Sequence, residues 1–350
     1  MLGNIIVDCQ PSHVFADEVA IEGGPNTKIE SNIIRNTRMI GIASYDISGA
    51  ATVGSNTIKG NVICNSSPTG IVCGSSVARI TDNVIAGSSR YGIDILPGAR
   101  ARIENNIIAG HSWGAINCDN ADASINNTVL VTDSWDIIYS DGAIISMNST
   151  IDITNSVFVD RRPGGSEISG LDGSRISMKN NLLSGGTGAP IVDETSILNW
   201  DSGKVDTDPL FLDMGQWSDP GTPWDPNDDT FILGDYHLLP GSPCIDAGAN
   251  DVDNPDTPEI ETLPATDISG LPRMIDGDLD GTATVDVGAY EYLPGDVNYD
   301  GKVNVLDLLL VRTSLGRDPA SSIEARKADV NADGAVNVED LIAVRGRLGR

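Results

Sequence analysis

The first 200 residues repeat one short pattern, and this repeat limits the possible folds more than any other feature of the chain. An apolar residue is followed three positions later by a residue with an amide or hydroxyl side chain, and a second apolar residue comes two positions after that. The seven repeats start 22–28 residues apart and are Ile29/Asn32/Ile34, Val53/Asn56/Ile58, Ile80/Asn83/Ile85, Ile103/Asn106/Ile108, Ile125/Thr128/Leu130, Ile153/Ser156/Phe158 and Met178/Asn181/Leu183. A period of this length indicates a solenoid, in which each turn packs on its neighbours.

Residue types separate the possible solenoids. Ile and Val dominate the repeats and the leucine scaffold of a leucine-rich repeat is absent, while a second apolar run begins at Gly41, Gly70, Gly92 and Gly114. Two or three short strands per turn, with few aromatic residues and many glycines, favour a mainly β fold. Residues 1–200 therefore resemble a right-handed parallel β-helix.

The asparagine column has a structural explanation in such a fold. Amides stacked about 4.8 Å apart can each donate and accept a hydrogen bond along the column. Asn4 and Ile6 continue the same register, so we expect the chain to begin inside a coil. A truncated start would also account for the lack of a visible signal peptide.

Two stretches near the C-terminus nearly repeat each other: DVNYDGKVNVLD (Asp296–Asp307) and DVNADGAVNVED (Asp329–Asp340). Oxygen-bearing side chains stand at positions 1, 3, 5, 9 and 12, with glycine at position 6, which is the pattern of a calcium loop. The predicted ligands are Asp296, Asn298, Asp300, Lys302 (by its carbonyl), Asn304 and Asp307, and then Asp329, Asn331, Asp333, Ala335 (by its carbonyl), Asn337 and Asp340.

An apolar helical pattern follows each loop, with Gly316 and Gly349 as expected helix stops. Val303 and Val336, at position 8, are expected to pair as a β-bridge between the loops. Position 12 is Asp in both loops, and Pro294 and Gly295 precede the first loop, so we expect no helix there.

Residues 295–350 resemble a type I dockerin, the duplicated calcium-loop module that binds cohesin domains of scaffold or cell-surface proteins. The resemblance implies two bound Ca²⁺ ions, a cohesin-type partner and an α-helical module after the β-helix. Partner choice in that family rests on loop positions 10 and 11, here Val305–Leu306 and Val338–Glu339.

Residues 201–294, which we call the acidic segment, contain 21 acidic and 2 basic side chains. Their phrases DPLFLD, DYHLLPGSPCIDAG and IDGDLDGTATVDVGAYEY resemble the region that follows β-helices in secreted bacterial proteins, notably planctomycete ones. The resemblance implies a cap over the strand edge of the last coil. Asp276, Asp278 and Asp280 alternate before Gly281, which is consistent either with a third calcium site or with an acidic turn.

The net charge of −28 argues against nucleic acid and anionic membranes as partners. The sequence has no apolar run long enough to span a membrane, and five cysteines without a CxxC motif indicate no disulfide framework. We expect a monomer in an extracellular or cell-surface location.

A catalytic site is less clear. Counting five residues past each second-strand start places Asp119 and Asp141 on adjacent coils, about 5 Å apart. That separation suits the carboxylate pair of a retaining glycosidase, although two turn-capping aspartates would show it too. Trp113 and Trp135, at the same interval, are candidates for stacking on sugar rings.

Two functions fit these observations. One is a secreted, calcium-binding, dockerin-bearing β-helix protein that binds or degrades polysaccharide, as a glycoside hydrolase or lyase if it is an enzyme. The other is a non-catalytic surface or adhesion protein that uses the dockerin-like module as an anchor.

Overall fold

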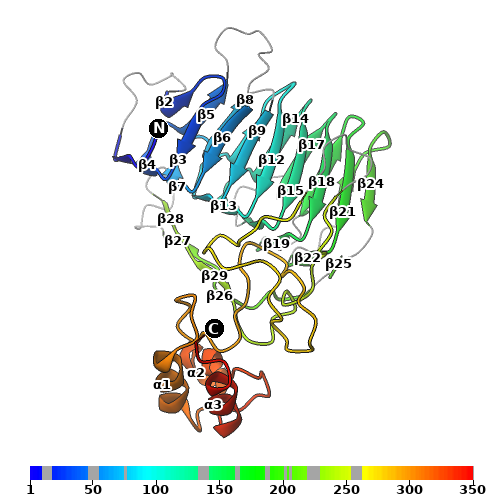
Figure 1. The fold of residues 1–350 in the computed structure, drawn as a ribbon. Coiled ribbons are helices and arrows are strands. Elements are labelled where there is room, and N and C mark those ends of the chain that lie inside the picture. The colour runs from blue at the N-terminus through cyan, green and yellow to red at the C-terminus, as the bar shows by residue number, and fades with distance from the viewer. Residues whose placement is uncertain are drawn as a thin grey trace.

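Successive coils of the chain build three parallel sheets (Figure 1). The computed structural model describes residues 1–9, 18–45, 55–74, 77–132, 142–161, 166–185, 190–200, 203–204, 207–218, 229–253 and 262–349. Each complete coil gives one strand to each sheet, so strands three apart in the sequence lie side by side. This arrangement is the predicted parallel β-helix.

We name the sheets A, B and C. Sheet A contains β3 (Lys28–Glu30), β6 (Ser55–Lys59), β9 (Val77–Thr81), β12 (Arg100–Glu104), β15 (Asp122–Asn126), β18 (Thr150–Thr154), β21 (Arg175–Lys179) and β24 (Ile197–Trp200). Sheet B contains β1 (Ile5–Val7), β4 (Ile33–Thr37), β7 (Val62–Ser66), β10 (Val84–Ala86), β13 (Ile107–His111), β16 (Val129–Thr132), β19 (Val157–Asp160), β22 (Asn181–Ser184) and β25 (Gly203–Lys204). Sheet C contains β2 (Val19–Gly23), β5 (Ile40–Tyr45), β8 (Ile71–Gly74), β11 (Tyr91–Ile95), β14 (Gly114–Asp119), β17 (Ile144–Met147), β20 (Ile168–Leu171) and β23 (Ile191–Val192).

The interior of the coil is a set of stacked apolar side chains. In sheet B, Ile34, Ile63 and Ile85 are paired in register and fully buried. The glycines that start the sheet C strands have a steric reason, since a Cβ at Gly41 would lie 2.6 Å from the carbonyl oxygen of Gly70. Burial of each such isoleucine contributes about 1.5–3 kcal/mol to folding.

The amide column is confirmed, with one correction. Asn32 Nδ2 donates to Asn61 Oδ1 at 2.8 Å, and Asn61 Nδ2 donates to Asn83 Oδ1 at 2.9 Å. Asn61 therefore occupies the place predicted for Asn56, and the second repeat is Ile58/Asn61/Ile63. Asn56 lies in sheet A instead, where its Nδ2 donates to Ser44 Oγ.

The predicted Asn4 position is correct, because Asn4 Nδ2 donates to Asn32 Oδ1 at 2.9 Å. Asn83 continues the column to Asn106 at 3.0 Å. Beyond it, the Thr128 backbone N–H donates to Ser156 Oγ, so a hydroxyl takes over the accepting role.

A second column, which the sequence reading missed, stands immediately before the first. The residue ahead of each column residue has a left-handed backbone, as in Asn105, Asn127, Asn155 and Asn180, with φ between 47° and 55°. Asn tolerates this conformation better than most residues. All four side chains form hydrogen bonds with the acidic segment. Asn105 bonds to Arg273 and Thr266, Asn127 to Asp286, Asn155 to Ala249, and Asn180 to Ala247.

The described residues of the acidic segment lie along the outer face of sheet B (Figure 1). Its strands β26 (Phe211–Asp213), β27 (Gln216–Ser218), β28 (Thr230–Ile232) and β29 (Asp235–Leu238) form two small antiparallel sheets. Phe231 and Tyr236 pack in one apolar cluster with Val129 and Val157 of the coil. Outward-facing Ala and Val make this face apolar, and the described part of the segment covers it; the cap over the strand edge of the last coil stays a prediction.

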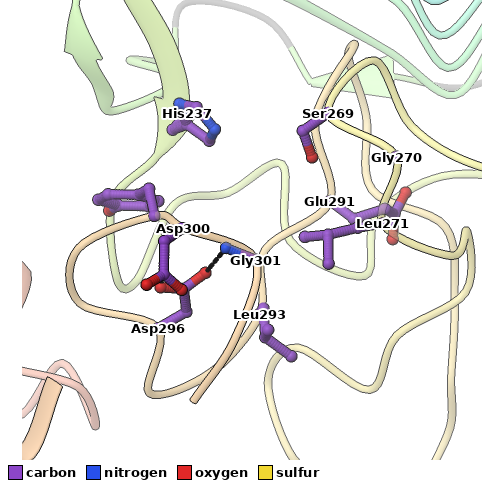
Figure 2. Close-up of a pocket in the computed structure, with 10 residues that line it drawn as sticks. His237, Ser269, Gly270, Leu271, Glu291, Leu293, Asp296, Asp300 and Gly301 are labelled. Atoms are coloured by element: carbon purple, nitrogen blue, oxygen red, sulfur yellow. Dashed lines mark hydrogen bonds between the residues drawn. The ribbon is translucent and has the colours of Figure 1, made fainter. Parts of the chain in front are cut away.

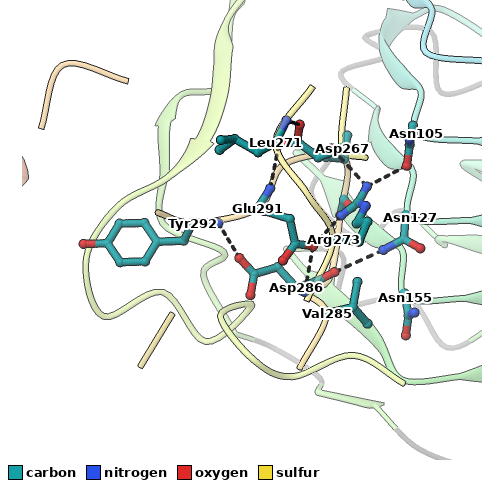
Figure 3. A network of polar contacts seen from close by, with 12 residues as sticks. Asn105, Asn127, Asn155, Asp267, Leu271, Arg273, Val285, Asp286, Glu291 and Tyr292 are labelled. Atoms are coloured by element: carbon teal, nitrogen blue, oxygen red, sulfur yellow. Dashed lines mark hydrogen bonds and ion pairs between the residues drawn. The ribbon is translucent and has the colours of Figure 1, made fainter. Parts of the chain in front are cut away.

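Buried charge fixes the segment to the coil (Figure 3). Arg273 pairs with Glu291 at 2.7 Å and donates to Asn105 Oδ1 at 2.6 Å, and both Arg273 and Glu291 are buried. Asp286 accepts the backbone N–H of Tyr292, and burial together with the charge of Glu291 raises its pKa well above the usual range.

The C-terminal module is helical. It contains α1 (Val305–Ser314), the short 3-10 helix η1 (Pro319–Ser321), α2 (Ile323–Ala328) and α3 (Val338–Arg345), packed around a small apolar cluster that includes Val303, Val336 and Val344. Within the described part of the chain, no helix is long and apolar enough to cross a membrane.

Candidate metal centre

The first predicted loop closes on its own carboxylates. Asp296 Oδ2 accepts the backbone N–H of Gly301 at 2.8 Å (Figure 2). Asp307 Oδ1 accepts from Val297 at 2.8 Å, and its Oδ2 accepts from Asn304 at 2.8 Å. The position-12 carboxylate therefore reaches back across the loop.

Other predicted residues of the first loop converge on Asp300. The amides of Asn298 and Asn304 donate to Asp300 Oδ2 at 3.0 and 3.4 Å, and the Lys302 backbone N–H donates to Asp300 Oδ1 at 3.0 Å. Gly301 has φ of 80°, which supports the prediction that a side chain is disfavoured at position 6.

The second loop repeats this geometry. Asp329 Oδ2 accepts from Gly334, Asp340 Oδ2 accepts from Asn337, and Asn331 Nδ2 donates to Asp333 Oδ2 at 3.1 Å. The Ala335 carbonyl accepts from Asn337 Nδ2 at 3.1 Å. All of the predicted ligand residues in both loops thus lie in the two turns.

The donor set suits a hard divalent cation. Burial raises the pKa of Asp296 to about 6, and the charges of Asp307 and Asp300 add to the rise. Asp307 and Asp340 are fully buried. Several carboxylates at close range, with amide and carbonyl oxygens between them, are the oxygen ligands that Ca²⁺ takes. A bound Ca²⁺ would neutralise these carboxylates and hold the two ends of each loop together.

Each loop leads directly into a helix. Asn304 caps α1 and Asn337 caps α3, each in a capping box with the position-12 Asp. A cation that orders the loop would therefore also order the first turn of the helix.

Two expectations for this module are wrong. Val303 and Val336 form no bridge to each other among the described residues; their carbonyls accept the backbone N–H groups of Gly349 and Gly316. α3 ends at Arg345 with Gly346 as its C-cap, so Gly349 is not the helix stop, whereas Gly316 follows the Leu315 C-cap of α1 with φ of 75°.

The module packs on the acidic segment through Tyr299, at position 4 of the first loop. Its hydroxyl donates to the Leu238 carbonyl at 3.0 Å, the ring lies 5.0 Å from that of His237, and Lys327 Nζ lies 4.8 Å from the ring centroid. A cavity of about 300 Å³ opens beside this contact, between His237, Leu271 and Asp296 (Figure 2). The first loop is thus in contact with the segment that covers the coil.

Of the predicted carboxylate pair Asp119 and Asp141, the structure describes Asp119. Strand β14 pairs with β17 so that Asp119 lies opposite Met147, and Gly114 stacks on Gly142. The coil between them is six residues longer than the coil before, so a constant count along the sequence misses this register. Asp141 and Trp135 lie outside the described residues.

Asp119 has other polar neighbours on sheet C. Asn117 Nδ2 donates to Asp94 Oδ1 at 2.8 Å, and burial raises the pKa of Asp94, with the charge of Asp119 adding to the rise. Trp113 packs edge-on against Tyr91, and Arg90 lies 4.9 Å from the Trp113 ring centroid. These residues come from β11, β14 and the turns before them.

Of the third predicted set, Asp276 and Asp278 lie together, and Asp246 joins them. Asp280 is not part of this group. The sequence reading missed Asp246 because it stands 30 residues before Asp276, and no local pattern links the two.

Comparisons with known families agree with both halves of this description. A model for the right-handed beta helix region matches residues 48–204, and a model for the dockerin type I domain matches residues 294–349. None of the curated proteins compared with the chain matches it. Dockerin domains generally bind Ca²⁺, in agreement with the donor sets of the two loops. The chain is therefore a β-helix protein with a C-terminal type I dockerin domain.

Proposed function

We propose that this protein is secreted or displayed at a cell surface, and that its dockerin domain, with Ca²⁺ bound, tethers the β-helix to a cohesin-type partner. The observation that carries the proposal is a set of exposed apolar side chains at matching places of α1 and α3. Val305 and Val338, at loop position 10, are 69% and 62% exposed. Leu309 and Ile342, four residues later on the same helix faces, are 50% and 62% exposed.

The location of this apolar surface supports binding that depends on calcium. Both helices start inside a calcium loop and are capped by loop residues, so an ordered loop fixes the direction of these side chains. The contact of Tyr299 with the acidic segment involves loop 1 and leaves the exposed side chains of α1 and α3 accessible. We take residues 1–200, 201–294 and 295–350 as the working units, with the chain as a monomer.

The test is binding of the full chain to a panel of cohesin domains by calorimetry, with Ca²⁺ and with a chelator. We expect the full chain to bind one or more cohesins in Ca²⁺. The affinity of Leu309→Asp/Ile342→Asp should be at least about a hundredfold lower, because the variant would bury charges at the centre of the interface. Ile232→Asp is the matched control, since Ile232 is 50% exposed but lies in β28. Binding that survives the double variant would contradict the proposed surface.

We also propose that the β-helix associates with polysaccharide. The supporting observation is the polar group on sheet C, where Asp94, Asn117 and Asp119 lie close together near the Tyr91–Trp113 pair. Carboxylates and an amide next to an aromatic pair can bond to sugar hydroxyls and stack on a sugar ring.

A screen of plant, algal and animal polysaccharides for binding and for cleavage tests this role. We expect Asp94→Asn and Asp119→Asn each to reduce retention at least about tenfold. Cleavage that Asp119→Asn abolishes would make the protein a glycoside hydrolase or lyase. Cohesin binding without any polysaccharide binding would favour the non-catalytic anchor protein.

A further inference from the structure

The acidic segment contains a loop whose first six positions follow the pattern of the two dockerin loops, with oxygen-bearing side chains at positions 1, 3 and 5 and glycine at position 6. With Asp276 as position 1, its Oδ2 accepts the N–H of position 6, Gly281, at 3.2 Å. The same contact is made by Asp296 to Gly301 at 2.8 Å and by Asp329 to Gly334 at 3.0 Å.

The match continues along the loop. Asp278 at position 3 accepts from position 5 at 3.0 Å, and Asp280 at position 5 accepts from position 7 at 2.7 Å. Position 4, Leu279, has φ of 67° and Gly281 has φ of 95°, as at the equivalent positions of both dockerin loops.

The position-12 carboxylate, which this stretch of sequence lacks, is supplied from elsewhere. Asp246 Oδ2 accepts the N–H groups of positions 2 and 3, Gly277 and Asp278, at 2.8 and 2.7 Å. Its Oδ1 accepts the N–H of position 9, Thr284, at 3.1 Å. Asp307 accepts from these same three positions in the first dockerin loop.

An unsatisfied atom shows that the loop is incomplete by itself. The Asp276 Oδ1 atom is buried, and no described residue forms a hydrogen bond with it. One carboxylate oxygen from each of Asp246, Asp276 and Asp278 lies within 4.8 Å of the others. A buried carboxylate oxygen without a donor is costly unless a cation compensates it.

Among the described residues, the three aspartates accept hydrogen bonds from backbone N–H groups and not from basic side chains. The acidic segment contains two basic residues, Lys204 and Arg273. Arg273 is already bonded to Glu291 and Asn105. The charge at the three aspartates is therefore left for an ion from solution.

We propose that Asp246, Asp276 and Asp278 form a third Ca²⁺ site, a calcium loop whose closing carboxylate comes from a distant part of the chain. Ca²⁺ is the fitting ion because the ligands are hard oxygens in a loop of the same design as the dockerin loops. The ion would join the stretch around Asp246, which bonds to Asn155 and Asn180 of the coil, to the stretch that leads into Asp286. The site is independent of the proposed tethering.

The test counts bound Ca²⁺ per full chain by equilibrium dialysis in KCl with excess Mg²⁺. We expect about three ions on the natural protein and about one on Asp307→Asn/Asp340→Asn, which disables both dockerin loops. Asp246→Asn/Asp276→Asn is expected to retain about two, and the exposed control Asp208→Asn about three. Circular dichroism checks that the β-helix of each variant is folded.

Two ions on the natural protein and none on Asp307→Asn/Asp340→Asn would overturn the third site. That result needs no variant of the acidic segment, so it holds even if Asp246→Asn/Asp276→Asn fails to fold. Equal loss of calcium in Asp208→Asn and in Asp246→Asn/Asp276→Asn would also overturn it, because binding would then reflect net charge alone.

Discussion

The coil and the dockerin domain satisfy buried polar groups in opposite ways. In the coil, Asn61 and Asn83 each accept from one ladder asparagine and donate to the next. The ladder ends at Asn106, whose amide donates to the backbone carbonyls of Ile80 and Glu104. In the calcium loops the clustered groups are carboxylates, and backbone N–H groups satisfy only part of their accepting capacity. The amide ladder is therefore satisfied within the chain, whereas we expect a cation to complete each loop.

The acidic segment combines both designs. Its Arg273–Glu291 pair bonds directly to Asn105 of the coil, while its loop at Asp276 has the arrangement of a calcium loop. We therefore expect a chelator to affect the two designs differently. It should leave the stability of the neutral amide stacks unchanged and lower the stability of the carboxylate loops.

The largest effect is expected from the closing carboxylates. Asp307→Ala/Asp340→Ala removes the groups that accept from Asn304 and Asn337 and cap α1 and α3. A module this small has little core to compensate, so it should unfold even in Ca²⁺. Loss of helical circular dichroism with an unchanged β signal is the expected result, and retained helicity would contradict it.

The second largest effect is expected on the free energy of unfolding of the coil. Asn83→Ala removes hydrogen bonds to Asn61, Asn106 and the Ile58 carbonyl, which should lower the free energy of unfolding by about 3 kcal/mol. The loss should be the same with and without chelator, as measured by urea denaturation. Asn199→Ala, at an exposed strand position, is the control. A loss of stability in Asn83→Ala that depends on calcium would contradict the prediction.

A smaller effect is expected at the contact between the dockerin domain and the acidic segment. Tyr299→Ala removes the hydroxyl bond to Leu238 and the ring contacts with His237 and Lys327, which should weaken module docking by about 1–2 kcal/mol. Tyr299→Phe loses only the hydrogen bond and should show about half of that. Faster proteolysis between residues 290 and 300 measures the undocking, and unchanged rates in both variants would mean that the contact is unimportant.

The smallest effect is expected on the stability of the coil as the pH falls. His111 is buried in the coil, where burial lowers its pKa to about 3 and its Nδ1 accepts the Ser88 N–H. The unfolded chain binds a proton near pH 6.5 that the folded coil excludes, so stability falls as pH drops below that value. Between pH 7 and 5.5 the loss should be about 1 kcal/mol, and His111→Asn should lack it. Equal acid sensitivity in both proteins would contradict the assignment.

Local patterns in the sequence predicted the parts of the structure that local chemistry decides. The apolar–amide repeat predicted the β-helix, and the loop pattern placed each predicted ligand residue in one of the two turns. Asn56 was mistaken for Asn61 because Val53/Asn56/Ile58 and Ile58/Asn61/Ile63 share one spelling, and only strand pairing with Ile29 and Ile80 separates them.

Positions that depend on long-range packing could not be predicted. Met147 lies opposite Asp119 in the strand pairing, a register that a constant count along the sequence misses because coil lengths vary. Asp246 closes a loop that begins 30 residues later, and the Asn105 and Asn155 side chains hold a segment more than 90 residues away. These contacts follow from tertiary packing, which no short window of sequence contains.

We infer that calcium orders the carboxylate loops and leaves the coil, with its ladder of amide hydrogen bonds, unchanged. Hydrogen exchange on the full chain, with Ca²⁺ and with chelator, tests it directly. We predict that chelation removes protection from residues 296–307 and 329–340 and from the helices that follow, while the strands of sheets A, B and C exchange at unchanged rates. Equal protection of both loops in the two conditions, or loss of protection throughout the coil, would contradict the account.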